Sequence, residues 1–366
     1  MMSHVLLTGA TGLLGRYLVR DLVSLGVPVA ALARPSEKQS GTERVAEAMA
    51  PLDAPMPKVL EGDIAEPGLG LSAEDRAWVA ANCDRVLHSA ASLVFHCADQ
   101  GRDPWRSNYF GTQHVAALAR EAGIRSFHHV STAYVCGTRA GIIREDERNV
   151  GQAFRNDYEE CKCAAESWLA AEGGFESLTV YRPAVIVGDS LTGYTSTYHG
   201  PYRTFQFASL VVQQIDPDDD GKRHIPIRFA MDGAERHNLV PVDWVSAVIA
   251  RGVADPAKWG TTYHLAPPKP TTYGEIVNAL LDYFNVVGVT LVGERGLPAD
   301  QMTELETAFT DYIHTHSEYL GNEPLFDTTH TRTAFPDLPC PAVDGPMLTK
   351  LVEFAVNDQF GKRRRR

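Results

Sequence analysis

The stretch Thr8-Gly9-Ala10-Thr11-Gly12-Leu13-Leu14-Gly15 decides the fold. A short apolar run, His4–Thr8, leads into it, and apolar residues recur at helical spacing over Leu13–Leu25. In such a strand–turn–helix unit, the first glycine permits a tight turn and the second lets a pyrophosphate approach the backbone. The third lets the helix pack close to the strand. The pattern predicts a dinucleotide-binding turn rather than a purely structural one, with these contacts: Gly9, Thr11, Gly12, Leu13, Leu14 and Gly15.

Strand and helix patterns alternate outward from this turn. Further strands are predicted at Val27–Ala33, Lys58–Asp63, Arg85–Ser89, Phe127–Ser131 and Leu178–Val187. Helices are predicted at Ala73–Ala81, Asn108–Ala122 and Asp157–Ala171. Strand–helix–strand repeats of this length form right-handed βαβ units, which build a parallel sheet covered on both faces. The fold class is therefore α/β, with a doubly wound Rossmann-type parallel sheet.

The alternation breaks after about residue 188. Residues Gly188–Gly200 have the composition of a loop. Later elements are a strand at Leu239–Val242, a helix at Trp244–Val253 capped by Asp243, a strand at Tyr263–Ala266 and a helix at Thr272–Phe284. We expect a dinucleotide-binding Rossmann domain over 1–187 plus 238–266. A smaller, mainly helical C-terminal substrate domain is expected over 188–237 plus 267–366.

Composition narrows the class of protein. The chain of 366 residues is 44% hydrophobic and 22% charged, as is ordinary for a folded domain, and its net charge of −12 argues against nucleic-acid binding. It has no apolar run of 18 residues, no secretion signal and no C-x-x-C pair. We expect a cytoplasmic protein with reduced thiols, no membrane span and no metal site. The basic tail Lys362–Arg366 is expected to be a solvated terminus.

The second strand indicates which dinucleotide binds. An acid at its end would hydrogen-bond the ribose 2′-hydroxyl of NAD, but this chain has Arg34 there. An arginine pairs instead with a 2′-phosphate, and Arg44 can add to the same positive patch. The sequence therefore favours NADPH over NADH. Asp63, at the end of the third strand, has two open interpretations: it accepts a hydrogen bond from the adenine amino group, or it closes a turn.

Tyr158 and Lys162 are spaced i and i+4, which places both on one face of a helix. An ammonium near a phenol lowers the pKa of the phenol, which can then pass a proton to a carbonyl oxygen as hydride arrives at the carbon. Thr132, just after a strand, can hold the same oxygen. Tyr-x-x-x-Lys alone is common by chance. After a glycine-rich turn and a strand that ends in Ser-Thr, it predicts a catalytic group.

The chain resembles the extended short-chain dehydrogenase/reductase family. The matching segments, in the family's order, are Thr8–Gly15, Gly62–Asp63, His88–Ala91, Asn108–Thr112, Val130–Tyr134, Tyr158 with Lys162, Tyr181–Pro183 and Val240–Val245. The resemblance implies that Thr132, Tyr158 and Lys162 are the catalytic residues. It further implies a cofactor-binding set that includes Tyr158 and Lys162 and also Ile64, Ala90, Ala91, Asn108, Pro183 and Val185.

Two segments point to one branch of that family. Val130–Gly137 and Arg182–Gly193 are similar to fatty acyl-CoA reductases and thioester-reductase domains of peptide and polyketide assembly lines. That resemblance implies reduction of an acyl thioester, held by CoA or a carrier protein, to an aldehyde or alcohol. Three alternatives remain open: a ketone or aldehyde reductase of a secondary-metabolite pathway, a nucleotide-sugar epimerase or dehydratase, and a non-enzymatic NADP-binding redox sensor. A homodimer is a family-level expectation.

Substrate selection is expected in the loop Tyr194–Phe207 and the C-terminal helices. Its aromatic side chains either line an apolar substrate site or pack the two domains together; they are Tyr194, Tyr198, His199, Tyr202 and Phe207. A CoA phosphate could be contacted by Arg203, Arg223, Arg228 and Arg236, although a solvated surface is the simpler interpretation of those arginines.

Overall fold

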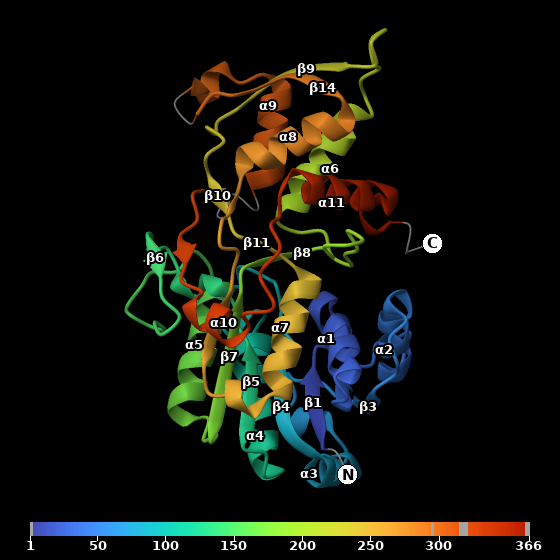
Figure 1. Cartoon of the computed structure of the whole chain (residues 1–366), viewed down its shortest axis with the longest axis vertical. Coiled ribbons are helices and arrows are strands. Elements are labelled where there is room, and N and C mark those ends of the chain that lie inside the picture. The colour runs from blue at the N-terminus through green and yellow to red at the C-terminus, as the bar shows by residue number, and fades with distance from the viewer. Residues whose placement is uncertain (1–2, 294–295, 315–320, 363–366) are drawn as a thin grey trace. The chain divides into compact units, whose positions relative to one another are not determined.

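We describe a computed structural model of the chain over residues 3–293, 296–314 and 321–362. Its contacts divide the chain into two compact units, both of them discontinuous in sequence (Figure 1). The first unit comprises Met1–Ala184, Val242–Ala266 and Phe326–Pro339. The second comprises Val185–Pro241, Pro267–Leu325 and Cys340–Arg366. Residues 363–366 of the basic tail lie outside the described residues.

A seven-stranded parallel sheet forms the centre of the first unit, in the order β12-β7-β5-β4-β1-β2-β3. Its strands are β1 (His4–Thr8), β2 (Val29–Ala33), β3 (Lys58–Glu61), β4 (Cys83–His88), β5 (Ser126–Val130), β7 (Ser177–Pro183) and β12 (Thr262–Leu265). The strand order reverses direction between β1 and β4, and ligands of doubly wound sheets bind at the carboxyl ends of strands at such a point. The predicted α/β doubly wound fold is confirmed.

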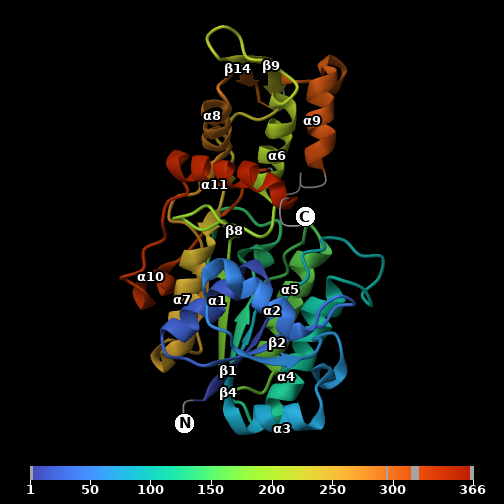
Figure 2. The same ribbon diagram turned by 90° about the vertical axis from the view of Figure 1, so that its right-hand side faces the viewer.

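Helices cover both faces of this sheet, and Figure 2 shows the strands between α7 on one side and α4 with α5 on the other. These helices are α1 (Leu13–Ser24), α2 (Gly41–Met49), α3 (Ala73–Asn82), α4 (Gly111–Glu121), α5 (Asp157–Glu172), α7 (Val242–Ala254) and α10 (Thr329–Ala334). A short π-helical turn, η3 (Arg106–Phe110), precedes α4, and a 3-10 turn, η4 (Ala133–Cys136), follows β5. β6 (Ile142–Ile143) pairs with β15 (Leu325–Phe326) outside the main sheet.

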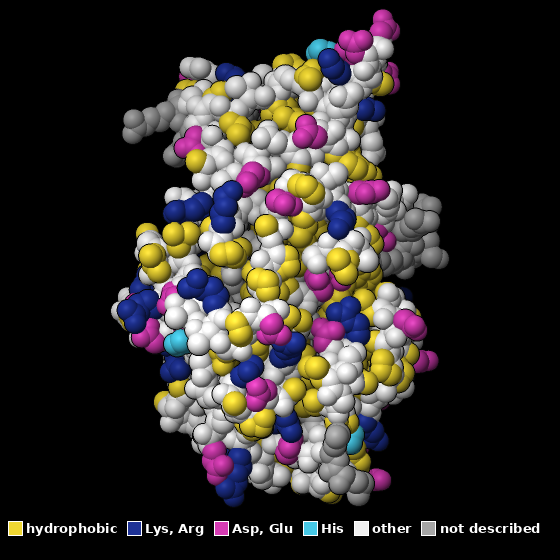
Figure 3. Space-filling view, in the orientation of Figure 1, with side chains coloured by type: hydrophobic (Ala, Val, Ile, Leu, Met, Phe, Trp, Pro, Cys, Tyr) yellow, Lys and Arg dark blue, Asp and Glu magenta, His cyan; other side chains and the backbone are white. Residues whose placement is uncertain are grey.

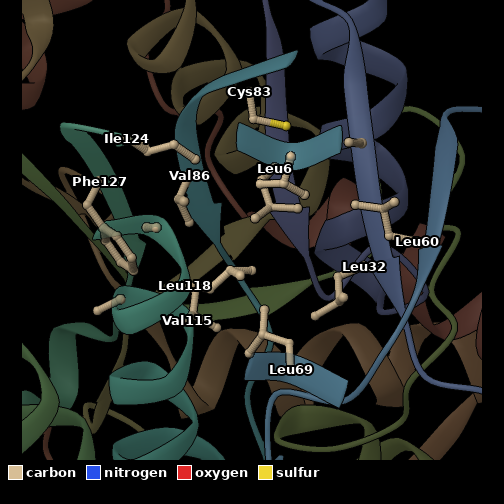
Figure 4. Close-up of a cluster of buried hydrophobic side chains, with 14 of the residues drawn as sticks. Leu6, Leu32, Leu60, Leu69, Cys83, Val86, Val115, Leu118, Ile124 and Phe127 are labelled. Atoms are coloured by element: carbon tan, nitrogen blue, oxygen red, sulfur yellow. The ribbon is translucent and has the colours of Figure 1, made fainter. Parts of the chain in front are cut away.

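The core of the first unit follows from strand periodicity. Successive side chains of a strand point to opposite faces, so Leu6 of β1 and Val86 of β4 face α3 and α4. They pack there with Val115 and Leu118 of α4 and with Phe127 of β5, all at most 2% exposed (Figure 4). This packing fixes the strands whose carboxyl ends carry the candidate site.

Several predicted boundaries differ from the observed ones. The expected strand Leu178–Val187 is two strands, because β7 ends at Pro183 and β8 (Val185–Val187) pairs with β11 (Leu239–Pro241) in the second unit. Asp243 lies inside the first turn of α7 rather than before the helix. The segment Phe326–Pro339, expected in the C-terminal domain, belongs to the first unit. The helix expected from Asn108 begins at Gly111, after the π-helical turn.

The second unit combines helices with short strands. Its remaining elements are α6 (Pro201–Val212), β9 (Arg223–Phe229), β10 (Arg236–His237), β13 (Thr271–Thr272), α8 (Tyr273–Phe284), β14 (Val286–Leu291), α9 (Glu304–His314) and α11 (Gly345–Asn357). The expected loop Tyr194–Phe207 is wrong in its second half, because α6 begins at Pro201. Proline is favoured in the first turn of a helix, where its missing N–H costs no hydrogen bond.

Aromatic side chains of this region pack inside the second unit. Tyr202 is 2% exposed, and its hydroxyl accepts a hydrogen bond from Gly188 N at 2.9 Å. Tyr194 contacts Phe354, and Phe207 contacts Phe309. A cavity of about 60 Å³ between α6, α8, α9, β9 and β14 has a wall of hydrocarbon, to which Phe207 contributes. These contacts lie within one unit and account for the aromatic residues there, whereas a role in binding substrate stays a prediction.

Surface charge is mixed on the face drawn in Figure 3, where lysine and arginine side chains alternate with aspartate and glutamate. No helix in the described part of the chain has the length and apolar content that crossing a bilayer requires. Within residues 3–293, 296–314 and 321–362, no cluster of three or more His, Cys, Asp or Glu side chains is arranged to hold a metal ion.

Candidate active site

The glycine turn between β1 and α1 requires glycine at two positions. Gly9 has φ +81°, and a Cβ atom there would lie 2.7 Å from Ala90 N. A Cβ atom on Gly15 would lie 1.9 Å from Gly9 O, so α1 can approach the turn only if residue 15 has no side chain. Gly12 N donates to Gly9 O at 3.0 Å and closes the turn. This backbone geometry is the one that the sequence spacing requires.

The amino end of α1 fits an anion. Gly12 precedes the helix without a side-chain acceptor for its free N–H groups, and the first turn carries no acidic residue. Thr11, Leu13 and Leu14 surround Gly12, whose backbone is exposed. Free N–H groups and the helix dipole favour a phosphate at this position. The residues present therefore fit the pyrophosphate of a dinucleotide.

Arg16 reinforces this turn and was not singled out in the sequence. Its Nη2 donates to Thr11 O at 3.1 Å and its Nε to Gly12 O at 3.3 Å. These bonds satisfy carbonyl groups of the turn and place a positive charge beside it. The signal in the sequence was an arginine directly after Gly15.

Arg34 and Arg44 meet at the carboxyl end of β2. The Arg34 side chain is 65% exposed and forms an ion pair with Asp63 at 3.3 Å, and Arg44 Nη1 donates to Arg34 O. Asp63 also accepts from Ala65 N at 3.0 Å, which supports its turn interpretation while the adenine interpretation stays a prediction. Ile64, next along the chain, packs its side chain toward Gly111 of α4.

A buried hydrogen-bonded chain links β1 to the turn before α4. Thr8 Oγ1 lies 2.7 Å from His88 Nδ1, and His88 Nε2 lies 3.0 Å from Thr112 Oγ1. Thr8 Oγ1 accepts from Ala90 N at 3.1 Å, and Thr112 Oγ1 donates to Asn108 O at 2.6 Å. A consistent chain of donors therefore places the histidine proton on Nε2. Burial lowers the pKa of His88 to about 3, which keeps the ring neutral.

Asn108 holds the segment that follows β4. Its Oδ1 accepts from Ser92 N at 2.8 Å, and its Nδ2 donates to Ser92 O at 3.0 Å and to Cys161 Sγ at 3.5 Å. The side chain thus connects the segment after Ala90 and Ala91 with helix α5. The structure gives Asn108 these protein partners, so a direct contact between its side chain and a cofactor stays a prediction.

Helix α5 carries the catalytic candidates at its first turns. Asn156 caps the helix by accepting from Glu159 N at 3.0 Å. The Thr132 hydroxyl lies close enough to the Tyr158 phenol to act on its pKa, which it lowers. Thr132 follows β5 directly, is 5% exposed and also accepts from Tyr134 N at 3.3 Å. The structure therefore brings together two residues that the sequence separates by 26 positions.

Burial is the largest influence on the pKa of Tyr158 in the structure, and the expected lowering of that pKa by Lys162 stays a prediction. Burial raises the pKa of the Tyr158 phenol above its usual value, against the influence of Thr132. The Lys162 ammonium is 1% exposed and donates to Val130 O at 2.7 Å. Burial lowers the pKa of Lys162 to about 8. The phenol is thus protonated at neutral pH, as a proton donor must be.

A buried ion pair lies one helical turn beyond Lys162. Arg182 Nη2 of β7 contacts Glu166 Oε2 at 2.7 Å, and both side chains are at most 1% exposed. Arg182 Nη1 also donates to Glu147 O at 2.7 Å. Pro183 ends β7 after this arginine, whereas Val185 begins β8 in the second unit. Glu166 was not predicted from the sequence, although its i+4 spacing from Lys162 was an available signal.

Three of the four arginines suggested for a CoA phosphate are engaged within the second unit. Arg228 pairs with Glu306 through two contacts at 2.8 and 2.9 Å. Arg223 donates to Ile215 O and Phe284 O, each at 3.2 Å, and Arg236 donates to Asn322 Oδ1 at 3.0 Å. Arg203, on α6, has a buried Nε atom without a hydrogen-bond partner among the described residues. These contacts support the simpler interpretation of Arg223, Arg228 and Arg236 as structural residues, and a contact with a CoA phosphate stays a prediction.

Comparison with known proteins identifies the family of the chain. The NAD-binding family model described as "Male sterility protein" matches residues 7–249. One chain of the linear gramicidin synthase of Brevibacillus parabrevis is 26% identical over 376 residues, which are 95% of this chain and 7% of that protein. Fatty acyl-CoA reductase wat of Drosophila melanogaster is 25% identical over 264 residues, 60% of this chain and 51% of that protein. The chain thus spans about half or less of the length of these two relatives.

One solved structure is similar to this chain over almost its whole length. The terminal R domain from the myxalamid PKS-NRPS biosynthetic pathway has a TM-score of 0.80 and 26% sequence identity, and the match covers 99% of this chain and 92% of that one. The family model spans more than half of the chain. The chain therefore belongs to the male sterility protein family, and it is an NAD(P)-dependent reductase of the extended short-chain dehydrogenase/reductase type.

Proposed function

We propose that this protein reduces an acyl thioester to an aldehyde with NADPH. The observation that carries the proposal is that Thr132, Tyr158 and Lys162 come together at the carboxyl end of β5, where the buried Lys162 donates to Val130 O at 2.7 Å. This constellation stands in the chain of a reductase whose relatives include a fatty acyl-CoA reductase and a gramicidin synthase. The thiol portion of the substrate is CoA or the phosphopantetheine of a carrier protein.

The residues of this chain have distinct roles in the proposed reaction. NADPH, when bound, supplies the hydride. Thr132 orients the carbonyl oxygen of the thioester, and Tyr158 donates its proton to that oxygen. The resulting hemithioacetal loses the thiol as its C–S bond breaks and its hydroxyl proton returns to the phenolate, which leaves the aldehyde. The proton that the released thiol requires comes from solvent, and Lys162, with a pKa lowered to about 8, holds a positive charge beside this exchange.

Arg34 and Arg44 support NADPH as the cofactor. The Arg34 guanidinium is largely exposed at the end of β2, where a 2′-phosphate would lie in a doubly wound fold. A charge-assisted hydrogen bond contributes about 1.5–3 kcal/mol. Arg34→Ala should therefore raise the dissociation constant of NADPH by about 10- to 100-fold and leave that of NADH unchanged. Arg125→Ala, on the surface of the same unit, is the control. Equal affinity of wild type for both cofactors contradicts the proposal.

The catalytic assignment is tested by Tyr158→Phe with Tyr109→Phe as a matched control. General acid catalysis contributes about 10²- to 10⁴-fold, so Tyr158→Phe should lose that factor in kcat while NADPH still binds. Consumption of NADPH is followed with CoA thioesters and with the aldehydes of the same chain length. Activity with aldehydes alone would favour a carbonyl reductase instead. Full activity of Tyr158→Phe would exclude the proton-donor role.

A further inference from the structure

A segment that the catalytic proposal does not use lies against the catalytic phenol. Residues 89–105 connect β4 to η3, and residues 89–104 form no helix or strand. Within this 89–105 segment, the ring of Phe95 meets the ring of Tyr158 edge to face, with centroids 6.1 Å apart. The part of the chain around Phe95 is therefore beside the ring of the residue that donates the proton.

The 89–105 segment is anchored to helix α5 on both sides of Phe95. Before it, Ser92 exchanges two hydrogen bonds with Asn108, which also reaches Cys161 of α5. After it, Cys97 N donates to Asp157 Oδ2 at 3.1 Å. Trp105 Nε1 donates to the other oxygen of Asp157 at 3.2 Å. Asp157 directly precedes Tyr158, so the segment and the phenol are held in one fixed arrangement.

The anchored 89–105 segment carries two apolar side chains that are exposed to solvent. Leu93 is 52% exposed and Val94 is 45% exposed, although large apolar side chains are usually buried. The two residues directly precede Phe95, and consecutive Cα atoms are about 3.8 Å apart, so both lie within about 8 Å of it along the chain. Apolar side chains that are exposed close to a catalytic group can contact the apolar part of a substrate.

We propose that Leu93, Val94 and Phe95 form an apolar wall that contacts the acyl chain of the substrate and favours long aliphatic chains over short or polar ones. The inference rests on the proposed function, because the reacting carbonyl must reach Tyr158 and the chain attached to that carbonyl must then leave along a neighbouring surface. The wall is fixed by Asn108 and Asp157, so it selects by burial of methylene groups and needs no rearrangement.

The test compares a double variant, Leu93→Ser with Val94→Ser, with a control that removes equally exposed apolar side chains elsewhere in the first unit. The control is Ile142→Ser with Val150→Ser, at positions that are 66% and 56% exposed. Acetyl-, hexanoyl- and decanoyl-CoA and the corresponding aldehydes are assayed with NADPH. NADPH affinity and the urea midpoint verify that each variant is folded.

The expected result is a loss of chain-length preference in the wall variant. Its kcat/KM for the decanoyl substrate should fall about 10- to 100-fold, mainly through KM, whereas the value for the acetyl substrate stays within about threefold. The control variant should retain the wild-type profile. A wall variant with the wild-type profile overturns the inference.

The two substrate series separate this inference from the proposed function. Wild type that reduces aldehydes but no thioester overturns thioester reduction, and the wall is then judged on the aldehyde series alone. Wild type that reduces thioesters with equal kcat/KM at every chain length overturns the wall and leaves thioester reduction standing. Wild type that reduces neither series overturns both.

Discussion

The interior beside helix α5 in the first unit differs in character from the interior around the cavity of the second unit. In the first unit, ionisable side chains are buried among the strands and beside the catalytic helix; His88, Lys162, Glu166 and Arg182 are each at most 1% exposed. In the second unit, a cluster of aromatic and aliphatic side chains surrounds a cavity of about 60 Å³. The interior beside α5 is specified by hydrogen bonds with fixed directions, and the interior around the cavity by contacts that have no direction.

This difference indicates which of the two interiors tolerates substitution less. A buried polar network is costly when one member is missing, so it holds its members in one arrangement. The network of the first unit includes the helix that carries Tyr158, and it therefore fixes catalytic geometry. An apolar interior with spare volume tolerates changes in size. The predictions below test whether the two interiors respond as this contrast requires.

The largest effect is expected from Arg182→Met in the first unit. The substitution leaves Glu166 buried without its closest partner and removes the donor to Glu147 O. Breaking one side of a buried ion pair costs about 3–5 kcal/mol, so the free energy of unfolding should fall by that amount. Urea unfolding followed by circular dichroism measures it.

The control for that prediction is Arg125→Met, which removes one member of an exposed ion pair with Glu176 in the same unit. Exposed pairs contribute about 0–1 kcal/mol, so the free energy of unfolding should barely change. If Arg182→Met were as mild as Arg125→Met, the buried network would not be the constraint that we describe.

Acid should destabilise the first unit through its buried histidines. Burial lowers the pKa of His88 and His128 to about 3 and that of His264 to about 4. The unfolded chain binds protons at these rings below about pH 6.5, but the folded chain does not. Stability is therefore full above that pH and is lost as the pH falls toward about 4. In this range, each histidine lowers the free energy of unfolding by about 1.4 kcal/mol for each unit by which the pH falls.

His129→Phe tests this pH dependence at one site. His129 is fully buried, neither of its ring nitrogens has a hydrogen-bond partner in the described part of the chain, and burial lowers its pKa well below the usual value. As the pH falls from about 7 to about 5, the free energy of unfolding of the variant should rise by about 2 kcal/mol relative to that of wild type. Parallel curves for His129→Phe and wild type would contradict a neutral buried ring.

The sequence predicted the features that depend on local backbone geometry. The positive φ of Gly9 and the contact between Gly15 and Gly9 are visible in the spacing of glycines, because only glycine fits such positions. The i, i+4 relation of Tyr158 and Lys162 follows in the same way from helix periodicity. Features of this kind need only neighbouring residues.

Features that depend on distant partners were not visible. The contact of Asn108 with Ser92 and Cys161 requires the fold to be known. The raised pKa of Tyr158 depends on how deeply the phenol is buried, and the sequence pattern suggested the opposite shift. Helix α6 was missed because its aromatic residues pack against α8, α9 and α11, far away in sequence.

The smallest effect compares the same substitution in the two interiors. Val86→Ile adds one methylene to a fully buried strand position of the first unit, where overpacking costs about 1–3 kcal/mol. Val286→Ile adds one methylene at the wall of the cavity in the second unit, where burying it contributes about 0.8 kcal/mol. The free energy of unfolding, measured with urea, should therefore fall for Val86→Ile and rise for Val286→Ile.

The sign of the change in the free energy of unfolding of Val286→Ile is decisive. Both substitutions keep a β-branched residue in a strand. Differences in strand propensity therefore cancel, and the remaining variable is the free volume around the added carbon. A stabilised Val286→Ile with a destabilised Val86→Ile means that the second unit has usable space where the first has none. Destabilisation of both variants would show that the cavity wall is as rigid as the sheet core, and the contrast between the two interiors would then rest on their polar groups alone.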